Sequence, residues 1–145
     1  MLSYVGRILL SLLLSGIIGW DREKNEKNAG MRTVMLVCLG ATVFTIISLY
    51  LKTQQGDRYD FGRIIAYIIV GIGFLGSGVI NQYKGNVDGT TTASVLWAVV
   101  SIGILCGLGL EVLAIVTALC IYAILKSKYI IYRGEIFIKS KKDKK

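Results

Sequence analysis

The chain has 145 residues, of which 54% are hydrophobic and 18% are charged, and its formal net charge is +8. A soluble domain carries about 25% charged residues, so this composition excludes an ordinary soluble domain and indicates a membrane protein. There is no histidine, and each of the three cysteines stands alone in an apolar segment. These features argue against zinc, haem and disulfide frameworks.

Five segments with almost no charge predict membrane helices, because a helix needs about 20 residues to cross about 30 Å of hydrocarbon. The last two segments adjoin at Glu111 and are together too long for one span, which predicts a hairpin that turns at residues 107–111. The predicted fold is therefore an all-α integral membrane protein, a bundle of about five transmembrane helices. A transmembrane domain is expected over 1–126 and a basic cytoplasmic tail over 127–145. The predicted helices are 2–20, 33–51, 64–83, 91–107 and 110–126.

The first predicted helix begins like a signal peptide, with Arg7 ahead of an apolar stretch. It has no small-x-small cleavage site and four more spans follow, so we expect it to remain uncleaved. Small residues recur at four-residue spacing in this helix and in the fourth, a pattern that permits close helix packing within the bundle. They are Ser11, Ser15 and Gly19 in the first helix, and Gly103 and Gly107 in the fourth.

The distribution of Lys and Arg predicts the orientation in the membrane. Four of these residues fall in the first loop, one in the third loop and eight after the fifth helix, while the other side holds four, including Arg7. Cytoplasmic segments carry the excess of basic residues, so we expect the N-terminus outside and the C-terminus in the cytoplasm. A basic tail beside a span is typical of attraction to anionic lipids, and no nucleic-acid partner is expected.

The third predicted helix, 64–83, has four glycines within twenty uncharged residues. Glycine allows a neighbouring helix to approach the backbone, which predicts that this segment is packed among other helices. The same letters spell G-x-G-x-x-G, but the dinucleotide motif needs a preceding strand and a later acidic residue, and both are missing here. The predicted helix-packing glycines are Gly71, Gly73, Gly76 and Gly78.

Three polar segments meet on the predicted cytoplasmic side. Asp21 lies at a helix C-terminus, where the macrodipole disfavours a carboxylate, so Arg22 or Arg32 is expected to compensate its charge. Thr91 and Thr92 stand where a hydroxyl can cap a helix N-terminus. The cluster is either a set of interface anchors, as charges at helix ends usually are, or an ionic network that binds an ion or a partner. Its members are Asp21, Arg22, Glu23, Arg32 and Thr33.

Arg7 lies about 8 Å into the first helix, at 1.5 Å per residue. Glu111 is the only charge between Asp88 and Lys126 and belongs to the outer turn. Because charges within the membrane tend to face the bundle and find partners, we expect an Arg7–Glu111 pair in the outer leaflet. The alternative is that Arg7 extends to the surface on its own.

In chain order, these polar and glycine-rich motifs resemble those of the MgtC/SapB family of bacterial inner-membrane proteins. The chain has G-W-D-R-E where the family has G-L-E-R-E, and A-G-M-R-T for A-G-L-R-T. Trp20, Asp21 and Thr90 depart from the family pattern, and Asp21 keeps the carboxylate with a shorter reach. The resemblance covers residues 1 to about 125 and is carried by 19–23, 29–33, 63–66, 71–80 and 89–97.

The resemblance implies a multi-pass protein of the bacterial plasma membrane linked to magnesium homeostasis or low-magnesium adaptation. Such a protein would regulate other membrane proteins or, alternatively, be a small Mg²⁺ transporter or channel subunit. Mg²⁺ takes oxygen ligands, and every Asp and Glu lies at the end of a predicted span or outside the spans. This argues against an Mg²⁺ path through a single chain and favours the regulator, whereas a pore between subunits stays open as an alternative.

Catalytic motifs such as a G-x-S-x-G elbow are missing, so neither an enzyme nor a cofactor is expected, and no metal ligands are assigned. The expected partners are the lipid bilayer, anionic lipids at the basic tail, other membrane proteins and further copies of the chain. Family members similar to the virulence protein carry a cytoplasmic C-terminal domain, which this chain is expected to lack.

Overall fold

The computed structural model describes residues 2–56, 59–83 and 86–142, and they form helices with one short β-hairpin. This confirms the all-helical fold expected from the sequence. The elements in chain order are α1 (Leu2–Lys24), α2 (Met31–Gln55), α3 (Phe61–Gly78), β1 (Asn81–Tyr83), β2 (Asn86–Asp88), α4 (Thr90–Leu108) and α5 (Glu111–Lys142).

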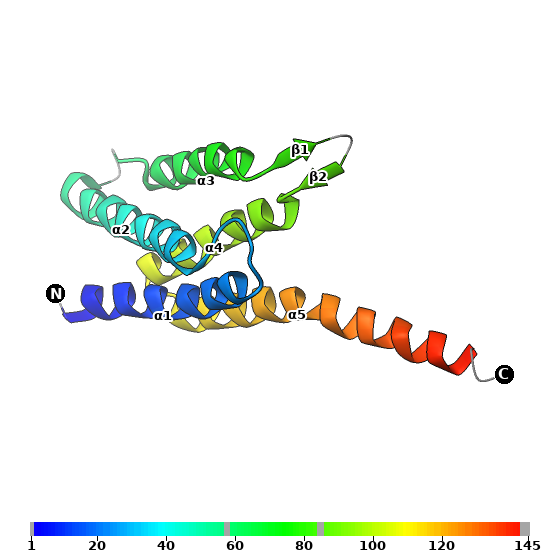
Figure 1. Cartoon of the computed structure of the whole chain (residues 1–145). Coiled ribbons are helices and arrows are strands. Elements are labelled where there is room, and N and C mark those ends of the chain that lie inside the picture. The colour runs from blue at the N-terminus through cyan, green and yellow to red at the C-terminus, as the bar shows by residue number, and fades with distance from the viewer. Residues whose placement is uncertain (1, 57–58, 84–85, 143–145) are drawn as a thin grey trace.

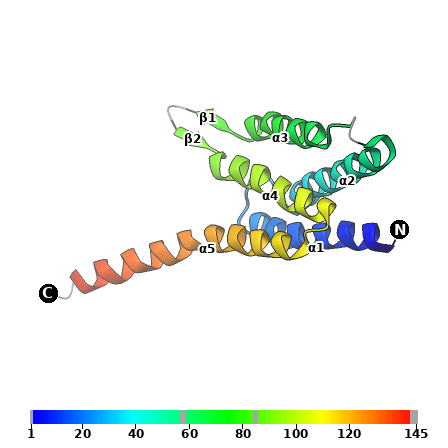
Figure 2. The same cartoon turned by 180° about the vertical axis from the view of Figure 1, so that it is seen from behind.

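Helix α4 is the central element of the bundle. Figure 1 shows α1 and α5 side by side along one edge, α2 and α4 crossing in the middle, and α3 on the opposite edge. The view from behind in Figure 2 gives the same order. Helix α4 contacts each of the other four helices, and half of its most apolar segment is buried, against 11% for α3. The bundle is thus built around α4, with α3 at its periphery.

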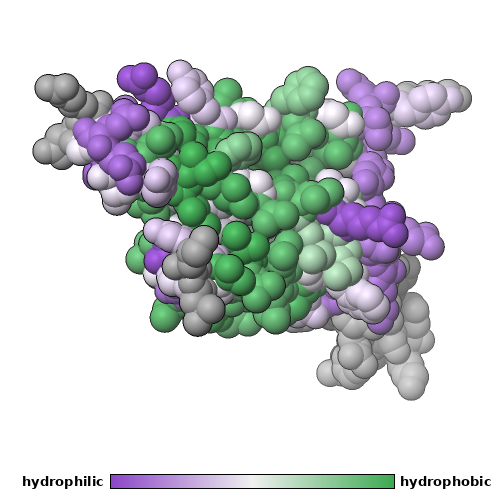
Figure 3. Space-filling view, turned by 90° about the vertical axis from the view of Figure 1, so that its left-hand side faces the viewer, coloured by the Kyte–Doolittle hydropathy of each residue, from purple (hydrophilic) through white to green (hydrophobic). Residues whose placement is uncertain are grey.

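Four of the described helices are long and apolar enough to cross a membrane, namely α1 from Ser3, α2, α3 and α4. Their outward surface is apolar. Phe74 is 81% exposed and Val70 is 74% exposed, both on α3. Figure 3 shows a continuous area of hydrophobic side chains on one face, with hydrophilic side chains gathered at its two edges. A soluble protein rarely exposes so large an apolar patch, whereas lipid tails cover one readily.

The predicted end of the third helix is wrong. The third predicted helix extends to residue 83, but α3 ends at Gly78 and Asn81–Tyr83 pairs as an antiparallel strand with Asn86–Asp88. Residues 79–83 carry no charge, so hydropathy did not separate them from the helix, although strand pairing satisfies their backbone equally well. The fifth predicted span ends at 126, and α5 continues beyond it to Lys142. A helix needs an apolar surface only where it is buried, so the basic residues after 125 do not end α5.

The N-terminus of α4 does not use the predicted threonine caps. Its N-cap is Gly89, at φ 87°, and no side chain caps the helix. Thr91 and Thr92 already lie inside the first turn, where Thr91 is exposed and Thr92 is buried. A Cβ on residue 89 would collide with the carbonyl oxygen of Val79, so the close approach of the β-hairpin requires glycine there.

The turn between α4 and α5 confirms the predicted hairpin. Gly109 lies at φ 78° and donates its N–H to the carbonyl of Cys106 at 3.0 Å. The N–H of Leu110 donates to Leu105 at 2.9 Å, which completes the paired hydrogen bonds typical of a glycine-terminated helix. Helix α5 then begins at Glu111, as an acidic residue at a helix N-terminus favours.

The small residues spaced by four confirm close packing within the bundle. Ser11 and Ser15 are fully buried in α1. A Cβ on Gly19 would lie 2.6 Å from the Cα of Met31, and one on Gly107 would lie 2.6 Å from the Cβ of Thr45. A Cβ on Gly103 would run into the Cys38 carbonyl oxygen. Lipid gives helices little hydrophobic reason to associate, so this interlocking of backbones holds the described helices together.

The glycines of α3 do not pack as predicted within this chain. A Cβ on Gly71, Gly73 or Gly78 would meet nothing within 4 Å among the described residues, and one on Gly76 would make an ordinary 3.7 Å contact with Ala93. Three of the four glycines therefore lie on the exposed surface of a peripheral helix. The glycine content of α3 indicated that a neighbouring helix could approach it closely. It did not show whether such a neighbour is present within the chain.

Candidate functional site

The predicted polar cluster lies where the C-terminal end of α1 meets α2, α4 and α5. Asp21, Arg22 and Glu23 are consecutive, so on a helix with 3.6 residues per turn they point about 100° apart. Each therefore reaches a different neighbouring helix. The structure places the three side chains in three separate contacts and not in one shared ionic network.

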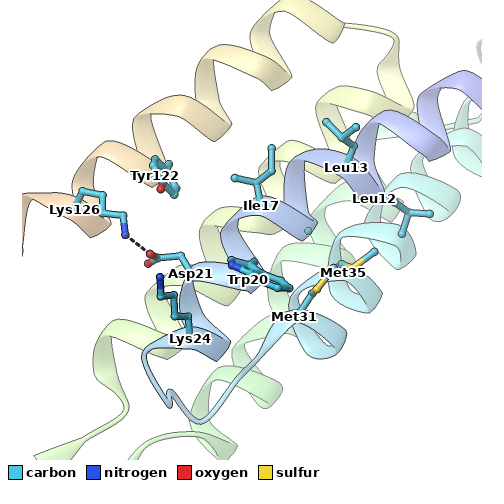
Figure 4. A pocket seen from close by; sticks show the side chains of 11 residues that line it. Leu12, Leu13, Ile17, Trp20, Asp21, Lys24, Met31, Met35, Tyr122 and Lys126 are labelled. Carbon is cyan, nitrogen blue, oxygen red and sulfur yellow. Dashed lines mark hydrogen bonds and ion pairs between the residues drawn. The ribbon is translucent and has the colours of Figure 1, made fainter.

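Asp21 pairs with a residue that sequence reasoning missed. Its Oδ1 atom accepts a hydrogen bond from the Lys126 ammonium, which comes from α5 (Figure 4). Asp21 is 9% exposed, and the same ammonium lies 5.4 Å from the centre of the Tyr122 ring. The expected partners, Arg22 and Arg32, are not within ion-pair distance of it among the described residues. The available signal was that Lys126 is the first charge after the uncharged segment 112–125.

Arg22 points toward α4. Its Nη2 atom donates to the Thr92 hydroxyl at 2.5 Å, and the two residues are 5% and 3% exposed. The Arg22 Nε atom is also buried and has no hydrogen-bond partner among the described residues. Because a buried charged donor is costly unless it is paired, the Thr92 hydroxyl stabilises Arg22 in this position. Thr92 therefore joins two helices instead of capping one.

Glu23 caps the following helix. Its Oε2 atom accepts the backbone N–H of Met31 at 2.8 Å, and Gly30, the N-cap of α2, has no capping side chain of its own. A carboxylate at this position also compensates the positive end of the α2 dipole. Arg32 and Thr33 are exposed and make no hydrogen bond or ion pair with the rest of the described chain. They belong to the cluster by sequence position only.

The opposite end of α1 contains the predicted Arg7–Glu111 pair. The Arg7 Nε and Glu111 Oε1 atoms are 3.9 Å apart, and Arg7 Nη1 donates to the Gly107 carbonyl at 3.1 Å. The guanidinium also lies 5.4 Å from the centre of the Tyr4 ring. This arrangement confirms the pairing, and Arg7 satisfies a free carbonyl at the end of α4 as well.

Nothing in the described part of the chain forms a group of three His, Cys, Asp or Glu residues that could hold a metal ion. Cys38 and Cys106 are buried free thiols, and Cys120 is an exposed one. The Cys38 thiol donates weakly to the Ser11 carbonyl at 3.6 Å. The polar groups of this site thus connect helices: α1 to α5, α4 and α2 at one end, and α1 to the α4–α5 turn at the other.

The MgtC family model matches residues 8–133, which include both ends of this arrangement. The chain belongs to the MgtC family. Protein MgtC of Salmonella typhimurium strain LT2 is 45% identical over 109 residues, which are 75% of this chain and 45% of that protein. Protein MgtC of Brucella abortus strain 2308 is 40% identical over 114 residues, 79% of this chain and 46% of that protein.

This MgtC family member spans about half the length of the curated relatives that it matches. No solved structure matches the chain. The family relationship confirms the resemblance seen in the sequence motifs. The side chains of residues 128–145, where anionic lipids were expected to bind, lie outside those that the structure describes.

Proposed function

We propose that this MgtC family member is a multi-pass protein of the bacterial plasma membrane that supports adaptation to low magnesium by regulating other membrane proteins, without enzymatic activity. One observation carries the choice of regulator over transporter. Three carboxylates at the ends of α1 and α5 are already engaged inside the chain: Asp21 by Lys126, Glu23 by the start of α2, and Glu111 by Arg7. A carboxylate whose oxygens already accept from a cation or a backbone N–H is a poor ligand for Mg²⁺, which needs several free oxygen atoms.

The proposed topology has five spans, with the N-terminus outside and the C-terminus in the cytoplasm. The fifth span is the uncharged segment 112–125 of α5. Two contacts support a common side for the first and third loops: Arg22 reaches Thr92, and the Asn28 amide lies 3.4 Å from the Val79 carbonyl. These loops also carry basic residues, as cytoplasmic loops do.

Growth of a strain that lacks its native MgtC protein tests the proposal. The wild-type chain should restore growth at low magnesium. Asp21→Asn should restore it poorly at normal membrane abundance, because the amide leaves the Lys126 ammonium without its counter-charge. Arg32→Gln is the control, since it removes an exposed charge that holds no partner in the described chain. Full growth with Asp21→Asn would indicate that the cluster only anchors the helix end at the membrane interface.

A flux assay separates the regulator from the alternative function. Purified protein in liposomes should move no more Mg²⁺ than empty liposomes. Flux above that background, lost in Asp21→Asn, would instead support a small Mg²⁺ transporter or channel subunit. Failure of the wild-type chain to restore growth would contradict the link to magnesium limitation itself.

A further inference from the structure

A groove of about 660 Å³ lies between α1, α2 and α5, beside the Asp21–Lys126 contact. Figure 4 shows that its lining side chains come from these three helices. Its long part is apolar and its short end is charged. The apolar lining is Leu12, Leu13, Gly16, Ile17, Met31 and Met35.

The apolar part of the groove runs along α1. Between Leu12 and Trp20, α1 rises about 12 Å, at 1.5 Å per residue. Gly16 lines the groove without a side chain, and a Cβ there would contact the ends of the Met35 and Met31 side chains at 3.6 and 3.7 Å. Met31 and Met35 are flexible side chains that fit an irregular apolar occupant. A narrow apolar groove along a membrane helix has the shape that a hydrocarbon chain can fill.

The charged end of the groove carries a net positive charge. Lys24 and Lys126 line it together with one acid, Asp21. Trp20 and Tyr122 also line it, and such amphipathic aromatic residues favour the level of the lipid headgroups. An anionic phosphate is therefore complementary to this end of the groove, in line with the attraction of juxtamembrane lysines to anionic lipids.

We propose that the groove is a binding site for one anionic phospholipid, with its phosphate at Lys24 and Lys126 and one acyl chain along Gly16. The charge distribution distinguishes this occupant from a neighbouring helix. A helix end beside Lys24 would have to supply negative charge, whereas basic residues are enriched at the cytoplasmic ends of membrane helices. A phospholipid supplies both the negative charge and the hydrocarbon chain in one molecule.

Native mass spectrometry of the detergent-solubilised chain, titrated with phosphatidylglycerol or phosphatidylcholine, tests this site. One phosphatidylglycerol should bind in preference to phosphatidylcholine. Lys24→Gln should weaken its binding about fivefold, the effect expected for loss of one cation near an anionic lipid. Lys27→Gln is the matched control: Lys27 is exposed three residues further on and does not line the groove.

A second pair of variants tests the acyl-chain part without changing any charge. Gly16→Leu should fill the groove and abolish the preferential binding. Gly6→Leu, in the same helix with nothing within 4 Å of its Cβ position, should leave it unchanged. Melting curves without added lipid show whether Gly16→Leu is folded, and the Lys24→Gln result stands independently if it is not.

Three results would overturn the lipid site. The first is equal affinity for the two phospholipids. The second is displacement of phosphatidylglycerol by soluble glycerol phosphate at the same concentration, which would indicate a free-phosphate site. The third is a lipid-free dimer that disappears in Gly16→Leu, because it would place a second copy of the chain in the groove.

Discussion

At the scale of single residues, the polar side chains that matter most are those whose charged or hydroxyl ends are buried between helices. Arg22 and Thr92 are an example, since both are nearly inaccessible and each comes from a different helix. The N–H groups of such a guanidinium have few other hydrogen-bond acceptors within reach in an apolar bundle. Loss of one acceptor should therefore weaken the contact between α1 and α4.

Thr92→Val keeps the shape of the side chain and removes the acceptor for Arg22. An unsatisfied buried donor costs about 1–3 kcal/mol, so the melting temperature of the purified protein in detergent should fall by several degrees. Thr91→Val is the control, because Thr91 is exposed in the preceding position. If both variants melt with the wild type, the Arg22–Thr92 hydrogen bond contributes nothing measurable.

The Arg7–Glu111 pair should show energetic coupling. Glu111 is about half exposed and the two atoms are 3.9 Å apart, so the coupling between them should be only about 0.5 kcal/mol. Arg7→Ala should cost more than Glu111→Ala, since it also loses the Gly107 carbonyl contact. A double-mutant cycle on unfolding free energies measures the difference. Strictly additive losses would mean that Arg7 acts independently of Glu111.

At the scale of the helices, the glycines of α3 and α4 have opposite roles, although α3 contains more of them. Helix α4 presents Gly103 and Gly107 to the backbone and side chains of α2, where no room remains for a Cβ. Helix α3 presents Gly71 and Gly73 to open space. Glycine content alone therefore does not identify the helix that holds the bundle together.

Gly103→Ala should destabilise the protein, because overpacking an already close contact costs about 1–3 kcal/mol. Gly73→Ala should be neutral or slightly stabilising, since alanine favours helix by about 1 kcal/mol where space is free. Thermal unfolding of the two variants in parallel provides the measurement. A severe loss in Gly73→Ala with a normal Gly103→Ala would show that the α3 glycines face a partner molecule.

Sequence patterns predicted the elements better than their ends. Uncharged runs identified every described helix, and the hairpin predicted at residues 107–111 contains the observed turn into α5 at Gly109. The same reasoning wrongly assigned residues 79–83 to the helix, because Val79, Ile80 and Tyr83 are as uncharged as the helix before them. Strand pairing across the hairpin is a tertiary outcome that hydropathy does not encode.

The candidate site was predictable only in part, because its contacts also depend on how the helices pack. The Arg7–Glu111 pair could be inferred because each was an isolated charge at the same end of the bundle. Asp21 had nearer cations in sequence, yet helix rotation points Arg22 toward α4 and leaves Asp21 facing α5. Choosing Lys126 would have required the rotation of α1 and the position of α5 along it.

At the scale of the whole molecule, the contacts of α1 divide between two ends. The C-terminal end of α1 contacts Lys126, Thr92 and the start of α2. Its N-terminal part contacts Glu111 and Gly107 through Arg7. These two sets of contacts correspond to the two predicted sides of the membrane. The predicted orientation rests on the distribution of basic residues and can be tested directly.

Cysteine labelling of intact cells checks this orientation. In a Cys120→Ser background, where the other two thiols are buried, a membrane-impermeant maleimide should label Gln55→Cys on whole cells. Lys27→Cys should be labelled only after lysis, because basic loops are expected in the cytoplasm. The reverse pattern would invert the topology, and equal labelling of both would show that α2 does not cross the membrane.

The fastening of α1 at both ends has a mechanical consequence. A helix held at one end can move by breaking the contacts at that end alone. Helix α1 would have to break its contacts near Arg7 and near Asp21 in the same movement. Any displacement of α1 along its axis would therefore disturb its contacts with α2, α4 and α5 together. Helix α3, mostly unburied and linked to α4 through the β-hairpin, takes no part in these contacts at the two ends of α1.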